Sequence, residues 1–220
     1  MIQNLEKYKG IIFDLDGVIV STDNCHFEAW KKMADEEGIY FDRIINERLR
    51  GVSRMESLEI ILEKAEKEYT EEEKRELAQR KNGYYVEKIK ALDESAVLPG
   101  AMEFICRVKE MGLKTAIGSS SKNAKIILSQ TGCGEKFDAV TDGNDIRNSK
   151  PAPDVFLKAA KRLQLEPEQC LVVEDADAGV EAALNAGMDV LAVGFASKNK
   201  KATYSAATLK DVLISIIKIK

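Results

Sequence analysis

The sequence has little cysteine and proline, a single histidine and no long hydrophobic run. Its four cysteines lie far apart, which argues against a zinc knuckle or a redox dithiol; they are Cys25, Cys106, Cys133 and Cys170. The first residues lack the apolar core of a signal peptide, and no later run reaches the roughly 20 apolar residues of a membrane helix. We therefore expect a soluble, cytoplasmic protein whose cysteines are buried thiols.

There is also no excess of positive charge. Lys and Arg number 33 against 37 Asp and Glu, so the formal net charge is -4, which argues against a nucleic-acid partner. An acidic protein can attract a phosphate ester only through local basic groups, backbone N–H groups or a metal. With 45% hydrophobic residues, the chain can bury a substantial core, either as one domain or as one domain with an insertion.

Short runs rich in Ile, Val and Leu recur along the chain and predict strands buried on both faces. They are Gly10 to Phe13, Lys114 to Ile117, Ala139 to Val140, Cys170 to Val173 and Val190 to Val193. Segments with helical spacing alternate with the later runs, and the last of them closes the chain. They are Ala101 to Met111, Asn123 to Gln130, Asp154 to Leu163, Ala178 to Ala186 and Leu209 to Ile217. This alternation predicts an α/β fold with a doubly wound, Rossmann-like parallel sheet.

The stretch from Ser21 to Leu92 has a different character. It is rich in Glu, Lys and Leu, contains no convincing strand, and shows helical spacing at Cys25 to Glu37, Arg54 to Glu68 and Glu71 to Ile89. We expect an inserted all-helical domain at 21–92 and a core formed by 1–20 and 93–220.

Two acids follow the first predicted strand. Alternation would point Asp14 and Asp16 to one side and Leu15 to the other. Neighbouring carboxylates repel each other, so such a pair indicates a bound metal ion, a proton shared between the two groups, or two carboxyl groups with different chemical roles. An ordinary Asp-Gly turn explains the motif about equally well.

Three more polar segments follow predicted strands. The first is Ser119-Ser120-Ser121-Lys122-Asn123, which could cradle a phosphate or simply cap a helix. The second is Lys150, held before Pro151, and the third is the pair Glu174 and Asp175. Each has an ordinary surface or capping explanation. Carboxyl ends of parallel strands meet at one edge, however, so all four segments together predict a phosphate site.

These four segments resemble the four motifs of the haloacid dehalogenase superfamily of phosphotransferases, and the helical insertion is similar to its mobile cap. The resemblance implies that Asp14 is the nucleophile that forms an aspartyl phosphate and that Asp16 is the general acid and base. It implies Mg²⁺ held by Asp14, the Asp16 carbonyl, Glu174 and Asp175. Ser119, the Ser120 N–H group and Lys150 would hold the transferring phosphate.

Within the superfamily, the likeness is greatest to mutases that act on a glucose phosphate. It implies a distal phosphate site formed by Arg54 with Ser121, Lys122 and Asn123, beside the loop Gly51-Val52-Ser53. It places Thr22, His26 and Trp30 at the entry to the cap, and Lys81 near the substrate. The spacing alone would make Arg54 an exposed helix residue, and Trp30 part of the cap core.

The implied partners are a phosphorylated hexose and a hexose bisphosphate intermediate, and we expect a monomer that binds neither nucleic acid nor membrane. A sugar-phosphate phosphatase is the first alternative, since it shares the architecture. A signalling receiver also pairs acids with a lysine, but receivers are compact domains, and the roughly seventy-residue insertion argues against one.

Overall fold

The protein is built around a six-stranded sheet in which every neighbouring pair is parallel. The computed structural model describes residues 5–217, with side chains described as far as residue 215. The strand order is β3-β2-β1-β4-β5-β6. The strands are β1 (Gly10–Phe13), β2 (Lys114–Gly118), β3 (Ala139–Thr141), β4 (Cys170–Glu174), β5 (Asp189–Ala192) and β6 (Tyr204–Ser205). The predicted doubly wound sheet is confirmed, whereas β6 is too short to be recognised from periodicity.

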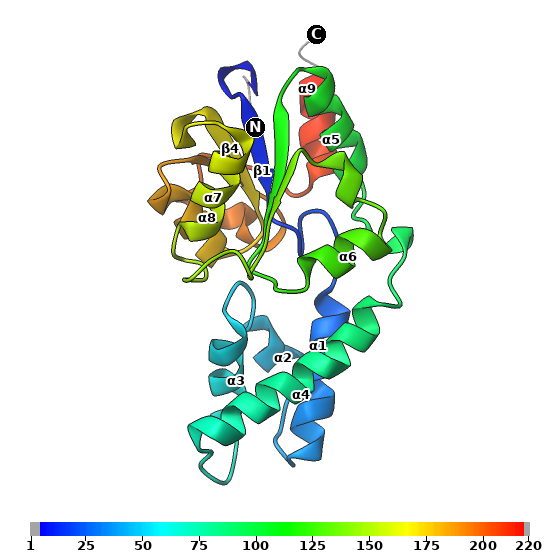
Figure 1. Ribbon diagram of the computed structural model, residues 1–220, viewed down its shortest axis with the longest axis vertical. Helices are drawn as coiled ribbons and strands as arrows, with labels where there is room; N and C mark the ends of the chain where they lie inside the picture. Colours follow the sequence, from blue (N-terminus) through cyan, green and yellow to red (C-terminus); the bar gives the residue numbers. More distant parts are fainter. Residues whose placement is uncertain (1–4, 218–220) are drawn as a thin grey trace.

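Helices cover both faces of this sheet (Figure 1). Ile11 and Phe13 belong to one apolar cluster and Ile12 to another, as alternation along a strand requires. The first cluster includes residues of α5 (Ala101–Glu110), α6 (Ala124–Gln130) and α9 (Leu209–Ile217); the second includes residues of α7 (Asp154–Leu163) and α8 (Asp177–Asn185). Both faces are thus buried, which is why the strands are continuously apolar.

Four helices between β1 and β2 form a third apolar cluster, built around Trp30, Met33 and Leu58. They are α1 (Asp23–Glu36), α2 (Arg43–Glu47), α3 (Arg54–Leu62) and α4 (Glu71–Ile89). Figure 1 shows them at one end of the molecule, beyond the carboxyl ends of the strands. We call them the helical cluster.

The expectation that all four cysteines are buried is wrong, because Cys106 is exposed and Cys25 is only partly buried. Two expectations about helices also need correction. The helix predicted from Arg54 to Glu68 ends at Leu62, because its last residues are mostly charged and Thr70 starts α4 with a capping box. Helix α2 was not predicted; it has five residues, and the Asp42 side chain caps it by accepting from the Ile45 N–H group at 2.9 Å.

The chain changes direction between β1 and β4. The connection from β1 leads to β2 on one side, and that from β4 leads to β5 on the other. Phe13 and Val173 are register partners, so the residues after each strand emerge side by side. Ligands bind at such a switch point in open α/β sheets. Within residues 5–217, no helix has the length and apolar character needed to cross a membrane.

Candidate active site

A cavity of about 650 Å³ lies where the carboxyl ends of the strands face the helical cluster. It is lined by every site residue that the sequence indicated: Asp14, Asp16, Thr22, His26, Trp30, Gly51, Val52, Ser53, Arg54, Lys81, Ser119, Ser120, Ser121, Lys122, Asn123, Lys150, Glu174 and Asp175. Residues separated by more than 150 positions in the sequence thus share one chamber.

Lys150 binds two of the acids at the floor of this chamber. Its Nζ donates to Asp14 Oδ1 and to Glu174 Oε1, each at 2.5 Å, and all three side chains are buried. Burial alone would lower the pKa of Lys150, but the charges of Asp14 and Glu174 raise it above its ordinary value. The lysine therefore stays cationic and holds both carboxylates.

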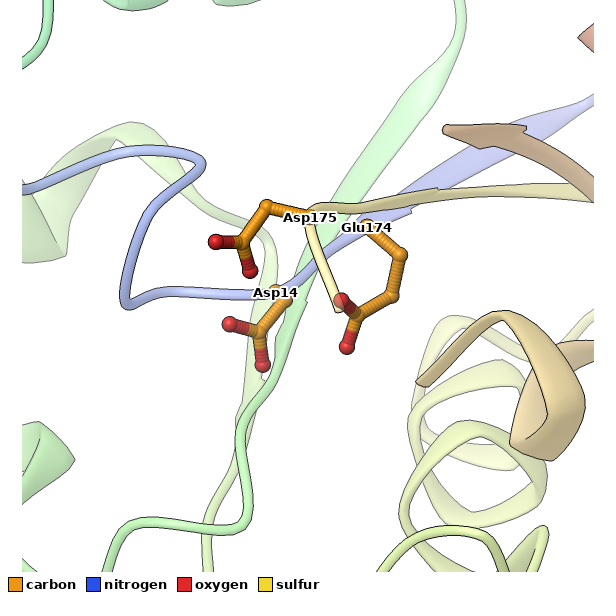
Figure 2. A group of neighbouring side chains, drawn as sticks. All are labelled: Asp14, Glu174 and Asp175. Atoms are coloured by element: carbon orange, nitrogen blue, oxygen red, sulfur yellow. The ribbon is translucent and has the colours of Figure 1, made fainter. Parts of the chain in front are cut away.

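Three carboxylates converge beside this ion pair: Asp14, Glu174 and Asp175 (Figure 2). One ligand oxygen from each lies within 4.8 Å of the other two. Burial, opposed in part by Lys150, raises the pKa of Asp14 to about 7, and burial with the Glu174 charge raises that of Asp175 to about 9. Three acids share one ammonium, so this oxygen-rich donor set can exchange a proton for a further cation, which fits a hard divalent ion such as Mg²⁺.

Asp16 lies on the turn after β1. Its Oδ1 accepts a hydrogen bond from the Thr22 hydroxyl, and burial raises the pKa of the carboxyl. Gly17 permits this turn, because its φ is +82° and a Cβ there would overlap the Asp175 carboxylate. A carboxyl of raised pKa can hold a proton near neutral pH and donate it.

The loop before α6 is organised by its own serines. Ser119 Oγ accepts from the Ser121 N–H group at 3.1 Å, and Ser121 Oγ accepts from the Asn123 N–H group at 3.2 Å. The Ser120 hydroxyl is buried without a hydrogen-bond partner. The loop thus presents polar groups to the cavity.

The helical cluster contributes a cation to the opposite wall. Arg54 is the first residue of α3 and directly follows the N-cap Ser53, which forms a capping box with Glu56. Neither Arg54 nor Lys122, which also lines the cavity, forms an ion pair with a carboxylate of the described chain. Asn123 Nδ2 donates to Asn82 Oδ1 at 2.9 Å and joins the two walls.

Lys81, which is buried, pairs with His26, which is partly buried. Lys81 Nζ lies 3.0 Å from His26 Nδ1 and 4.5 Å from the centre of the Trp30 ring. Burial and the nearby Arg54 charge lower the pKa of Lys81 to about 7, and burial with the Lys81 charge lowers that of His26. Trp30 is also part of the apolar cluster, as its helical spacing predicted.

Tyr85 and Arg50 are among the lining residues for which no role was predicted. Tyr85 follows Lys81 by one helical turn, and the centre of its ring lies 4.1 Å from that of the His26 ring; that i, i+4 spacing was a usable signal. Arg50 pairs with Asp23 and Glu47. It directly precedes the loop Gly51-Val52-Ser53, but no role of its own was predicted for it from the sequence.

Comparison with known proteins agrees with this geometry. Residues 8–187 match the family model described as haloacid dehalogenase-like hydrolase. The chain is 45% identical to β-phosphoglucomutase of Bacillus subtilis over 84% of its length and 83% of that protein. It is 32% identical to the fructose-1-phosphate phosphatase YqaB of Escherichia coli, covering 86% of this chain and 97% of that one.

Among solved structures, β-phosphoglucomutase from Clostridium difficile superposes with a TM-score of 0.86 at 39% identity, covering 96% of each chain. The family match covers residues 8–187, and the structural match covers nearly the whole protein. This chain belongs to the haloacid dehalogenase-like hydrolase family.

Proposed function

We propose that the protein is a magnesium-dependent β-phosphoglucomutase, an isomerase that interconverts β-D-glucose 1-phosphate and glucose 6-phosphate through an aspartyl phosphate and a bound bisphosphate. The observation that carries this proposal is the cation pair Arg54 and Lys122, which lines the same cavity as Asp14 and has no carboxylate partner in the described chain. A mutase must hold a second phosphate while the first one reacts, and a guanidinium suits that task.

In this mechanism, Asp14 attacks the phosphorus atom and forms the aspartyl phosphate. Asp16, whose pKa is raised, protonates the departing sugar oxygen and later takes the proton of the attacking hydroxyl. Lys150, Ser119 and the Ser120 N–H group hold the phosphate oxygens. Asp14, Glu174, Asp175 and the Asp16 carbonyl would hold Mg²⁺, which neutralises charge on the phosphate.

The helical cluster would act as a cap. In this proposal residues 21–92 close over a core of 1–20 and 93–220, of which 1–4 and 218–220 lie outside the described residues. Binding a phosphate at each end of the sugar would draw both walls together and exclude water, so that the phosphoryl group passes to sugar. Thr22, His26 and Lys81 would align Asp16 in the closed state. We further propose that this enzyme is a cytoplasmic monomer.

The decisive variant is Arg54→Ala. It should reduce conversion of β-glucose 1-phosphate by about 100-fold or more while hydrolysis of acetyl phosphate, which has no distal phosphate, stays near the wild-type rate. Arg48→Ala is the control, because Arg48 belongs to the same part of the chain, pairs with Glu63 and does not line the cavity. An equal loss of both activities would refute the distal site.

A sugar-phosphate phosphatase is the second candidate, favoured by the 32% identity to a fructose-1-phosphate phosphatase over 97% of that protein. In that case water replaces the sugar hydroxyl as the acceptor. Incubation with Mg²⁺, β-glucose 1-phosphate and a trace of bisphosphate separates the two functions. Accumulation of free phosphate faster than glucose 6-phosphate would favour the phosphatase and reject the mutase.

A further inference from the structure

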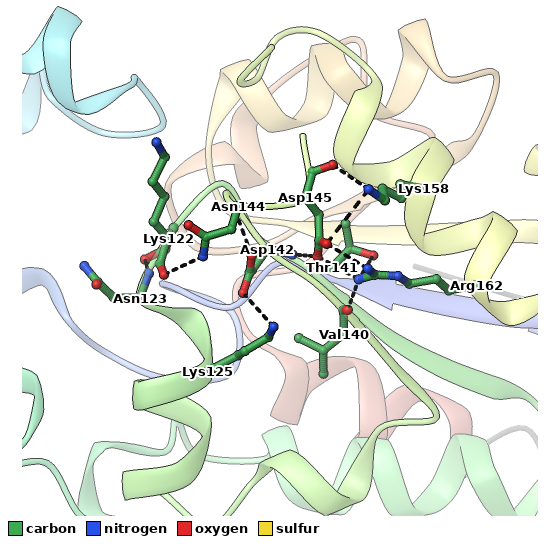
Figure 3. A network of polar contacts seen from close by, with 11 residues as sticks. Lys122, Asn123, Lys125, Val140, Thr141, Asp142, Asn144, Asp145, Lys158 and Arg162 are labelled. Atoms are coloured by element: carbon green, nitrogen blue, oxygen red, sulfur yellow. Dashed lines mark hydrogen bonds and ion pairs between the residues drawn. The ribbon is translucent and has the colours of Figure 1, made fainter. Parts of the chain in front are cut away.

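A tight turn, Asp142 to Asp145, follows β3 and lies against the loop that carries Lys122 and Asn123 (Figure 3). The Gly143 N–H group donates to the Ser121 carbonyl at 3.1 Å, and Asn144 Nδ2 donates to the Lys122 carbonyl at 2.9 Å. Lys122 lines the cavity, whereas Asn144 does not. The turn therefore supports the loop from outside the chamber.

The turn is held by its own acids. Asp142 is fully buried, and its Oδ1 accepts from the Asn144 N–H group at 2.8 Å, while its own N–H group donates to Asp145 Oδ2 at 3.0 Å. The second carboxylate oxygen of Asp142 has no hydrogen bond and lies 3.8 Å from Lys125 Nζ. Two short bonds thus fix the backbone on either side of Asn144.

The turn is also anchored to α7, a helix that packs on the sheet. Arg162 of α7 makes two hydrogen bonds to the Asp145 carboxylate, at 2.7 and 2.8 Å, and Lys158 donates to the Asp145 carbonyl at 2.6 Å. A Cβ at Gly143 would overlap the Ser120 carbonyl, so only glycine allows so close an approach. The side chain of Asn144 is thereby presented to the loop by a rigid support.

Figure 3 shows the Lys122 side chain extending away from the turn while its carbonyl faces Asn144. We propose that Asn144 is a positioning residue for the distal phosphate, acting by holding the backbone of Lys122 so that its ammonium and the adjacent Asn123 meet that phosphate. This inference rests on the proposed function, whose distal site it deepens. Asn144 itself touches no substrate.

The test uses Asn144→Ala in the full-length protein. The variant keeps the backbone bond to Asp142 and removes only the amide donor, which is exposed. Loss of one such bond should weaken binding of β-glucose 1,6-bisphosphate by about two- to tenfold. Acetyl phosphate hydrolysis should change by less than about twofold. Affinity is measured by calorimetry in an Asp14→Ala background, which cannot accept a phosphoryl group.

Lys109→Met is the matched control. It removes an exposed side-chain hydrogen bond to a backbone carbonyl, from Lys109 Nζ to the Lys136 carbonyl at 3.0 Å, away from the cavity, and should leave bisphosphate affinity unchanged. Unchanged affinity in Asn144→Ala, or a parallel fall in acetyl phosphate hydrolysis, would overturn the inference. Calorimetry measures binding and does not depend on turnover. If the wild-type protein binds the bisphosphate but makes no glucose 6-phosphate, that result refutes the mutase function and leaves the role of Asn144 in binding standing.

Discussion

The guanidinium of Arg50 lies 3.7 Å from the centre of the Phe195 ring. Arg50 lies between α2 and α3 of the helical cluster, and Phe195 lies in the short 3₁₀ helix Gly194–Lys198 after β5, where this residue is 60% exposed. Ion pairs with Asp23 and Glu47 orient the guanidinium. Since Arg50 also lines the cavity, this contact joins the two walls beside the site.

Phe195→Ala should weaken the contact between the helical cluster and the core, and so admit water to phosphorylated Asp14. An exposed cation–π contact stabilises by about 0.5–1 kcal/mol, so the ratio of free phosphate to glucose 6-phosphate should rise about two- to fivefold. The ratio is measured in one reaction mixture, and Phe195→Tyr, which keeps the ring, is the control. An unchanged ratio in Phe195→Ala would show that the contact does not help to exclude water.

Asp16→Asn should slow the reaction of a substrate whose leaving group needs a proton much more than that of a substrate whose leaving group does not. Transfer from β-glucose 1-phosphate should fall by about 100-fold or more, because the sugar oxygen needs a proton as it departs. Acetate leaves without one, so phosphorylation of Asp14 by acetyl phosphate should fall much less. Mass spectrometry of the phosphorylated protein and the coupled mutase assay measure the two steps. Equal losses would assign Asp16 a structural role.

Mg²⁺ binding should release protons at pH 7. The pKa of Asp175 is raised to about 9 by burial and the Glu174 charge, so this carboxyl is protonated until a cation binds. Ligation requires the ionised form, and we expect about one proton per cation or slightly more. Calorimetry in two buffers of different ionisation enthalpy measures it. Asp175→Asn should release fewer protons, and identical enthalpies in both buffers for the wild type would contradict the prediction.

Lys81→Met should stabilise the protein while lowering its activity. The folded pKa of Lys81 is about 7, lowered from 10.5 by burial. Between these values the unfolded chain binds more protons, so stability rises with pH across this window, and below pH 7 the full cost of the buried charge remains. The substitution should therefore raise the free energy of unfolding by roughly 2–4 kcal/mol at pH 6.

This gain should shrink as the pH rises from 7 towards 10.5, because the lysine is then neutral in the folded protein and the cost of deprotonating it falls as the pH nears its unfolded pKa. Urea unfolding at several pH values measures it. Lys90→Met, at the exposed end of the same helix, is the control and should show no such pH dependence. A gain of equal size at pH 6 and pH 10 would mean that the buried charge is not its source.

Local pattern was enough to predict most of the fold. The apolar runs at Ile11 to Phe13 and Leu171 to Val173 are buried on both faces, and this burial is what makes them readable as parallel strands. Failures occurred where local signals were short, as at β6, or where charge masked a helix end, as after Leu62. The core residues of the candidate site, such as Asp14, Ser119 and Glu174, could be proposed because they lie at strand ends, and parallel strands end at one edge. Those of the helical cluster, such as Arg54, were proposed only from the family resemblance.

Sequence by itself determined the chemistry available to this protein: paired acids, serines and a lysine at strand ends, and a helical insertion. Only the tertiary structure decided which groups meet. Lys150 reaches Asp14 across 136 positions, Lys81 meets His26 across 55, and Arg54 faces the acids from another layer. Such distances are set by strand order and by helix packing. No local periodicity encodes them, because each depends on contacts summed over the whole core.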